Sequence, residues 1–211
     1  RERIVTAGRE LFARKGYQQA GVKEIARAAG VAVGSFYAYF PDKQTLFLEI
    51  TEGYYREIFA RIQNAVGQGM RSEFFASPSQ SQDEIRVIVG TMIQALHDAH
   101  DIEPELHREL QLMILAGGNR GDGTGDQDRD TTMHRVVRER VDAMDREVQA
   151  WLTEIVRRYA PSRDAETTAA VVFRSAEETI HRLKFFPETM PPADAVIGEL
   201  SSMLSAYLFE E

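Results

Sequence analysis

The sequence contains no cysteine and no long run of apolar residues. Without thiols there can be no disulfide bond, no thiolate zinc site and no cysteine nucleophile. The longest stretch free of charged residues, 28–41, has 14 residues with two glycines and a proline, which is too short to cross a bilayer. The first residues also lack the continuous apolar core of a signal peptide. These absences favour a cytoplasmic protein with no membrane partner.

Alternation of apolar and polar residues, the pattern of half-buried strands, is nearly absent, whereas apolar residues at helical spacing recur along the chain. This spacing predicts an all-α protein with about nine helices. Gly16 and Gly30 are expected to end helices, and Asp42 is expected to cap the start of a long one. The composition of 77–81 and 117–130, the latter with five glycines and four aspartates, predicts exposed loops.

The net charge of the chain is −8, which taken alone argues against nucleic acid, because proteins that bind it usually carry a basic surface. The charge is, however, unevenly distributed. Residues 1–50 contain eight Lys and Arg against five Asp and Glu, a net charge of +3, whereas residues 51–211 contain 17 against 28, a net charge of −11. The acidity therefore belongs to the second part of the chain.

Two short helices joined by a turn over 29–32 have the proportions of a helix-turn-helix, in which a tight turn sets two helices at a steep angle. Ile25 and Ala26 before the turn, with Val31 and Phe36 flanking it, are expected to form the apolar contact that fixes this angle. The second helix of such a motif enters the major groove of DNA.

The remaining side of that second helix carries small residues that allow close approach, a hydroxyl that can bond a base edge, and phenols that can reach the DNA backbone. Lys43, at the start of the next helix, is expected to pair with a phosphate. The predicted DNA-binding residues are Lys23, Val33, Gly34, Ser35, Tyr37, Tyr39 and Lys43. The alternative is a helical hairpin buried for packing, which would not need polar and aromatic residues on an exposed side.

Residues 30–47, Gly-Val-Ala-Val-Gly-Ser-Phe-Tyr-Ala-Tyr-Phe-Pro-Asp-Lys-Gln-Thr-Leu-Phe, resemble the signature of the TetR (tetracycline-repressor-type) family of bacterial transcriptional regulators. The match extends upstream through Leu11-Phe12, Gly16-Tyr17 and Ile25-Ala26, so it covers about the first 50 residues. The rest of the chain is similar only in plan, as an all-helical regulatory domain of comparable length whose two final helices would build a dimer interface.

The resemblance implies a helix-turn-helix DNA-binding domain over residues 1–47 and a helical ligand-binding and dimerisation domain over residues 48–211. It implies a homodimer that places two recognition helices in successive major grooves of a pseudo-palindromic DNA operator. A small, largely apolar effector in the second domain would release the DNA by favouring another conformation. We therefore expect a repressor with no cofactor, metal or enzymatic activity. The alternative is an all-helical binding or adaptor protein without operator recognition.

Three positions depart from the family's pattern. Gly21 and Ala32 stand where Thr and Ser are frequent, so two side-chain helix caps are expected to be absent. Val33 stands where Lys or Arg is frequent, which suggests an apolar contact in place of a charged one, such as a contact with a thymine methyl group.

Apolar positions on the helices that enclose the ligand cavity in the resembled family are candidates for a pocket, with plain core packing as the alternative. Glu177 and His181, four residues apart on one helix, are candidates for a polar pair inside that cavity, with a surface pair as the alternative. The predicted ligand-binding residues are Phe59, Ile62, Met92, Leu96, Met144, Val148, Trp151, Glu177 and His181. The predicted dimer seam consists of Ala169, Val172, Ala176, Ile180, Leu200, Met203, Leu204 and Tyr207.

Two groups of polar residues suggest metal binding without meeting its requirements. His97, His100, Glu103 and His107 are close in sequence, but a proline breaks the helix before the last one, so exposed or core histidines are favoured. Residues 122–133 resemble a calcium loop but lack the Gly and Glu that such a loop needs at positions six and twelve. No nucleophile and base stand at an interpretable spacing, so the sequence offers no enzyme site.

Overall fold

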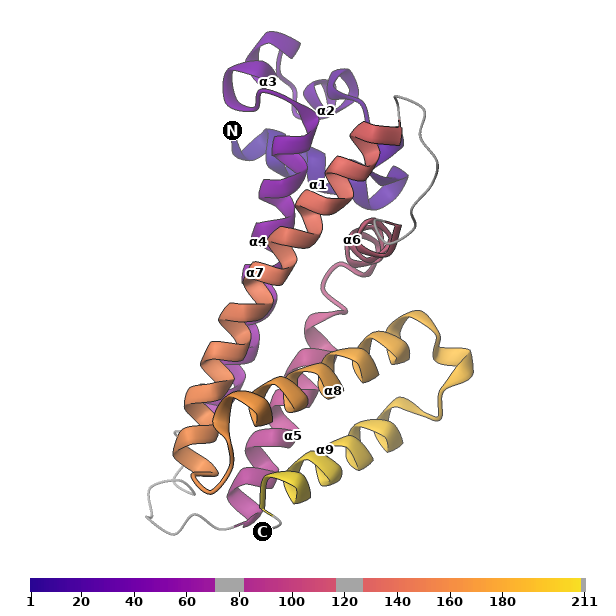
Figure 1. Ribbon diagram of the computed structural model, residues 1–211. Helices are drawn as coiled ribbons and strands as arrows, with labels where there is room; N and C mark the ends of the chain where they lie inside the picture. Colours follow the sequence, from indigo (N-terminus) through magenta and orange to yellow (C-terminus); the bar gives the residue numbers. More distant parts are fainter. Residues whose placement is uncertain (71–81, 117–126, 210–211) are drawn as a thin grey trace. The chain divides into compact units, whose positions relative to one another are not determined.

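The computed structural model describes residues 1–70, 82–116 and 127–209, and every regular element in these ranges is helical, which confirms the all-α prediction (Figure 1). The elements are α1 (Glu2–Gln19), α2 (Val22–Ala28), α3 (Val33–Tyr39), α4 (Lys43–Met70), α5 (Gln82–Ala99), α6 (Pro104–Ala116), α7 (Gln127–Tyr159), α8 (Ala165–Phe185), the short 3-10 helix η2 (Pro187–Thr189) and α9 (Ala193–Phe209). The loop predicted at 77–81 and residues 117–126 of the loop predicted over 117–130 lie outside the described residues. Residues 127–130 begin α7, so for them the loop prediction was wrong.

Local chemistry sets several helix ends. Gly16 has a φ of 78°, which interrupts α1 at the predicted stop, because only glycine adopts such a φ without steric cost. The Asp42 carboxylate accepts the Thr45 backbone N–H at 2.7 Å and the Thr45 hydroxyl at 2.8 Å, so it caps α4 as predicted. α4 continues through Gly67 to Met70, because an interior glycine costs a helix only about 1 kcal/mol and the neighbouring Val66 is buried.

The chain forms two compact units, and α4 and α7 contribute to both. Unit 1 comprises Arg1–Arg56 and Glu103–Met144, and unit 2 comprises Glu57–Ile102 and Asp145–Glu211. This division follows contacts in space. The predicted functional boundary between residues 47 and 48 concerns which segment binds DNA, and it stays a prediction.

In unit 1, aromatic rings join α1 to α4. The Phe12 ring meets the Phe47 ring edge-on at a centroid distance of 5.0 Å, and the Tyr17 ring lies 4.9 Å from Phe47. α6 packs along α1, where Glu103 pairs with Arg9 at 2.7 Å and the Glu109 carboxylate accepts the Tyr17 backbone N–H at 2.6 Å. In unit 1 the kinked end of α1 therefore packs against both α4 and α6.

In unit 2, α5 packs against α8 and α9, which also contact each other (Figure 1). Six residues predicted to form the dimer seam lie in this core, at 0 to 4% exposure: Ala169, Val172, Ala176, Ile180, Leu200 and Leu204. The physical reason is that an apolar stripe on an amphipathic helix is buried first against its own chain. Of the predicted seam only Met203, 54% exposed, and the half-buried Tyr207 reach the surface, and a dimer seam on these helices stays a prediction.

Candidate nucleic-acid interface

The turn between α2 and α3 is built on a glycine. Gly30 has a φ of 64°, the left-handed conformation that other residues rarely adopt. Its N–H donates to the Arg27 carbonyl at 3.0 Å, and the Val31 N–H donates to the Ala26 carbonyl at 2.9 Å. These two bonds form a Schellman motif, which satisfies carbonyls at the end of α2 and turns the chain sharply.

Apolar contact and one arginine hold the two helices at their angle. Ile25, Ala26 and Phe36 are completely buried and Val31 is half-buried, as the sequence predicts. The Arg3 guanidinium also donates to the Gly30 carbonyl at 3.1 Å. No local pattern could have indicated this bond, because the two residues stand 27 positions apart.

The outer side of α3 is exposed and, by sequence, uncharged. Tyr37 is 53% exposed, Tyr39 54% and Val33 37%, while Gly34 and Ser35 are also exposed. This side therefore offers two phenols, one hydroxyl, one methyl-bearing side chain and one position without a side chain. Such a surface offers close approach and hydrogen bonds to a partner and supplies no ion pairs of its own, and its contact with DNA stays a prediction.

The two helices of the motif begin without side-chain caps, and α2 carries charged residues. Gly21 and Ala32 begin α2 and α3 without a capping side chain, as predicted. Lys23 is exposed on α2. On the same helix Glu24 accepts a hydrogen bond from Lys15 at 2.6 Å, and this bond lowers the pKa of the Glu24 carboxyl below its usual range, so Glu24 stays ionised.

Lys43 has a role inside unit 1 that the sequence did not indicate. Its ammonium donates to the Tyr17 carbonyl at 2.6 Å and to the Gln18 carbonyl at 3.4 Å, and it lies 4.2 Å from the centroid of the Tyr17 ring. Lys43 thus links the start of α4 to the end of α1. Its contact with a DNA phosphate stays a prediction.

The predicted ligand-binding residues do not gather in one place. Met144 belongs to unit 1 and the other eight to unit 2. In unit 2 the Phe59 and Trp151 rings meet edge-on at 5.7 Å, whereas Ile62 and Leu96 are buried in the core. The alternative of plain core packing therefore describes much of this set.

Glu177 lies in a network of charged groups instead of pairing with His181. The Arg174 guanidinium bonds Glu177 at 2.6 Å and Asp145 at 2.9 Å. Burial raises the pKa of Glu177 to about 7, and the negative charge of Asp145 acts in the same direction, while Arg174 opposes them.

His181 lies beside a second histidine of unit 2. Its ring is 5.1 Å from that of His100, and burial, reinforced by His100, lowers the pKa of His181 to about 3. His100 is itself buried, with Nδ1 2.6 Å from the Leu96 carbonyl, and burial lowers its pKa as well. Both imidazoles are therefore neutral at pH 7.

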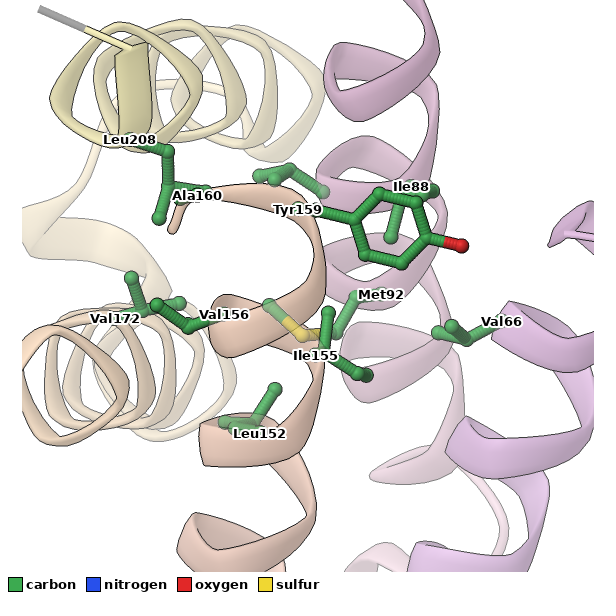
Figure 2. Close-up of a pocket in the computed structure, with 11 residues that line it drawn as sticks. Val66, Ile88, Met92, Leu152, Ile155, Val156, Tyr159, Ala160, Val172 and Leu208 are labelled. Carbon is green, nitrogen blue, oxygen red and sulfur yellow. The ribbon is translucent and has the colours of Figure 1, made fainter. Parts of the chain in front are cut away.

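Unit 2 contains an apolar pocket at a place that the sequence analysis did not indicate (Figure 2). The space among its lining side chains is about 490 Å³, including the mouth. It is lined by Val66, Ile88, Val89, Met92, Leu152, Ile155, Val156, Tyr159, Ala160, Val172 and Leu208. Met92 alone belongs to the predicted set.

Sequence comparison matches both parts of the chain to one family. Residues 4–50 match the sequence model described as bacterial regulatory proteins of the tetR family, and residues 127–208 match that of the tetracyclin repressor-like C-terminal domain. The chain belongs to the TetR family. The two matched ranges together cover more than half of it.

Individual relatives are similar in sequence over part of the chain. The chain is 41% identical over 66 residues to the uncharacterized HTH-type transcriptional regulator YuxN of Bacillus subtilis, covering 31% of this chain and 23% of that protein. It is 27% identical over 114 residues to the HTH-type transcriptional repressor KstR2 of Rhodococcus jostii, covering 54% and 52%. The match thus spans about half or less of these curated relatives.

A solved structure extends the similarity of fold to nearly the whole chain. A Mesorhizobium loti protein described as a TetR-family transcriptional regulator superposes with a TM-score of 0.64 at 18% identity, covering 98% of this chain and 93% of that one. Within the described ranges, none of the helices has the length and apolar character that a bilayer crossing requires.

Proposed function

We propose that this TetR-family protein is a DNA-binding transcriptional regulator that acts as a repressor. The observation that carries the proposal is the exposed outer side of α3, held on a helix-turn-helix by the Gly30 turn. The recognition helix would enter the major groove, with Tyr37 and Tyr39 at the backbone and Ser35 and Val33 at base edges. The net charge of +3 over residues 1–50 favours this end of the chain for DNA.

The protein is proposed to bind a pseudo-palindromic operator as a dimer. Two recognition helices one turn of DNA apart need half-sites about 34–36 Å from centre to centre. On α9, Ala195, Gly198, Ser202 and Ala206 are exposed at helical spacing beside Met203. Small residues allow a second helix to approach closely, so this stripe is the proposed seam with a second copy.

A small effector bound in unit 2 is proposed to release the operator. Its binding would favour a conformation in which the two α3 helices no longer match successive grooves, and affinity would fall by the ratio of effector affinities for the two states. The protein would act in the cytoplasm by binding alone, without catalysis and without a cofactor.

The deciding experiment is a gel-retardation assay, at several salt concentrations, with DNA from upstream of the gene that encodes this protein. We expect specific retardation whose affinity falls steeply with salt, because phosphate contacts release counterions. The seam is tested with Ser202→Arg, which should yield monomers in size-exclusion chromatography, against Glu188→Arg, a control on η2 outside the stripe. A folded dimer that retards no specific fragment at low salt would contradict the proposal and favour an adaptor without operator recognition.

A further inference from the structure

The pocket of unit 2 is closed by the ends of several helices. Val66 comes from the last turns of α4, Ile88 and Met92 from α5, Val156 from α7, and Leu208 from the end of α9 (Figure 2). Nine of the eleven lining residues are themselves less than 10% exposed, so the walls are formed by side chains that are fixed in the core. The space of about 490 Å³ includes solvent at the mouth, so it sets an upper limit on the volume of a ligand.

The chemistry of the lining is uniform. The surface that faces the space is entirely apolar, and it includes no charged side chain. The hydroxyl of Tyr159 is the one side-chain oxygen drawn at the site, and it points away from the side chains of α8 and α9 (Figure 2). A polar group brought into this space would lose its hydrogen bonds to water without replacement, which costs roughly 1–3 kcal/mol, and a charged group would cost more.

We propose that this pocket binds an uncharged hydrocarbon group, an aliphatic chain or a small alicyclic skeleton, and that this ligand is the effector. The inference rests on the proposed function for its regulatory part only. A methylene group occupies about the room of a water molecule in the liquid, about 30 Å³, so the space holds at most about 16 heavy atoms.

The first test compares ligands that differ only in their end group. Displacement of the uncharged dye N-phenyl-1-naphthylamine is measured with 1-decanol, decanoate and decylamine at pH 7.4. Because the lining has no partner for a charge, 1-decanol should bind at least tenfold more tightly than either ion. Tighter binding of decanoate or decylamine, or no binding of 1-decanol, would overturn the proposal.

The second test places the ligand. Val89 lines the pocket, whereas Val87, two residues earlier on α5, is 48% exposed. Val89→Phe should weaken 1-decanol binding at least tenfold, and the control Val87→Phe should change it less than twofold. Leu152→Ala enlarges the space, so the alkanol that binds most tightly should be longer than in the wild type. This variant tests the site if Val89→Phe fails to fold. Equal effects of Val89→Phe and Val87→Phe, or an unchanged optimum, would overturn the site.

An NMR measurement of ligand binding separates this inference from the proposed function. The methyl signal of Met92, assigned with Met92→Leu, should shift when 1-decanol binds, whether or not DNA is present. Loss of operator binding on addition of 1-decanol supports the regulatory part. A shift of Met92 without any effect on retarded DNA would overturn the ligand as effector while leaving operator recognition intact, and failure of all DNA retardation would overturn the proposed function alone.

Discussion

Glu177 makes the stability of unit 2 depend on pH in a direction opposite to that of most carboxylates. Its pKa is about 7 in the folded chain against an ordinary value of 4.5. Between these values the folded state holds a proton that the unfolded state has lost. The contribution of Glu177 to the free energy of unfolding is therefore greatest below pH 4.5 and is lost as the pH rises through 7.

The size of this effect follows from the shift. Each pKa unit corresponds to 1.36 kcal/mol, so the full loss is about 3 kcal/mol at most. Because the Glu177 side chain is 18% exposed, solvent screens part of this effect, and the expected loss of unfolding free energy is about 2 kcal/mol. Glu177→Gln preserves the shape and cannot ionise. It should exceed the wild type by only about 0.5 kcal/mol at pH 5 and by about 2 kcal/mol at pH 8.

Urea denaturation between pH 5 and 8, at one fixed protein concentration, measures this difference. The matched control is Glu178→Gln, the same substitution on the next residue, whose side chain is 73% exposed. Titration of His100 and His181 contributes equally to wild type and variants and cancels in the comparison. An advantage of Glu177→Gln that is equal at pH 5 and pH 8, or is shared by Glu178→Gln, would refute the reasoning.

Three further predictions concern unit 1. Gly30→Ala should destabilise it by about 1–2 kcal/mol in thermal melts, because alanine resists the left-handed φ and its Cβ would press against Arg3; an unchanged melting temperature would contradict this. Lys43→Ala should remove the bonds to Tyr17 and lower the slope of log affinity against log salt by about 0.9 for each phosphate lost, and an unchanged slope would leave Lys43 only its structural role. Asp42→Ala should cost about 1 kcal/mol by uncapping α4, whereas Asp42→Asn should largely restore it.

The helix-turn-helix could be predicted because its determinants are local. The Gly30 turn, the apolar residues Ile25 and Phe36 beside it, and the Asp42 cap all act over a few positions, so sequence spacing carries the information. Interactions between distant positions were not predicted. Arg3 bonds the Gly30 carbonyl and Lys43 bonds the Tyr17 carbonyl, and neither has a local signature.

Unit 2 was harder to predict, because helical periodicity identifies an apolar stripe but not what the stripe contacts. Ala176 and Leu204 form such stripes, and the structure buries them within one chain. Part of the pocket lining could have been predicted by extending the apolar stripes toward the helix ends. Val66 lies four residues after Ile62 on α4, and Ile155 lies four residues after Trp151 on α7. Which ends enclose a space depends on packing between helices, and that is not encoded at any single spacing.

Contact between the outer side of α3 and the operator is tested most directly by the operator affinity of Gly34→Leu, measured by fluorescence anisotropy. A Cβ at Gly34 meets nothing within 4 Å, and the same holds for the control position Gly53 on α4, so both variants should fold. Gly34→Leu is expected to lose specific binding because its side chain prevents close approach to the groove, while Gly53→Leu is expected to bind as the wild type does. Wild-type affinity in a folded Gly34→Leu dimer would contradict this contact.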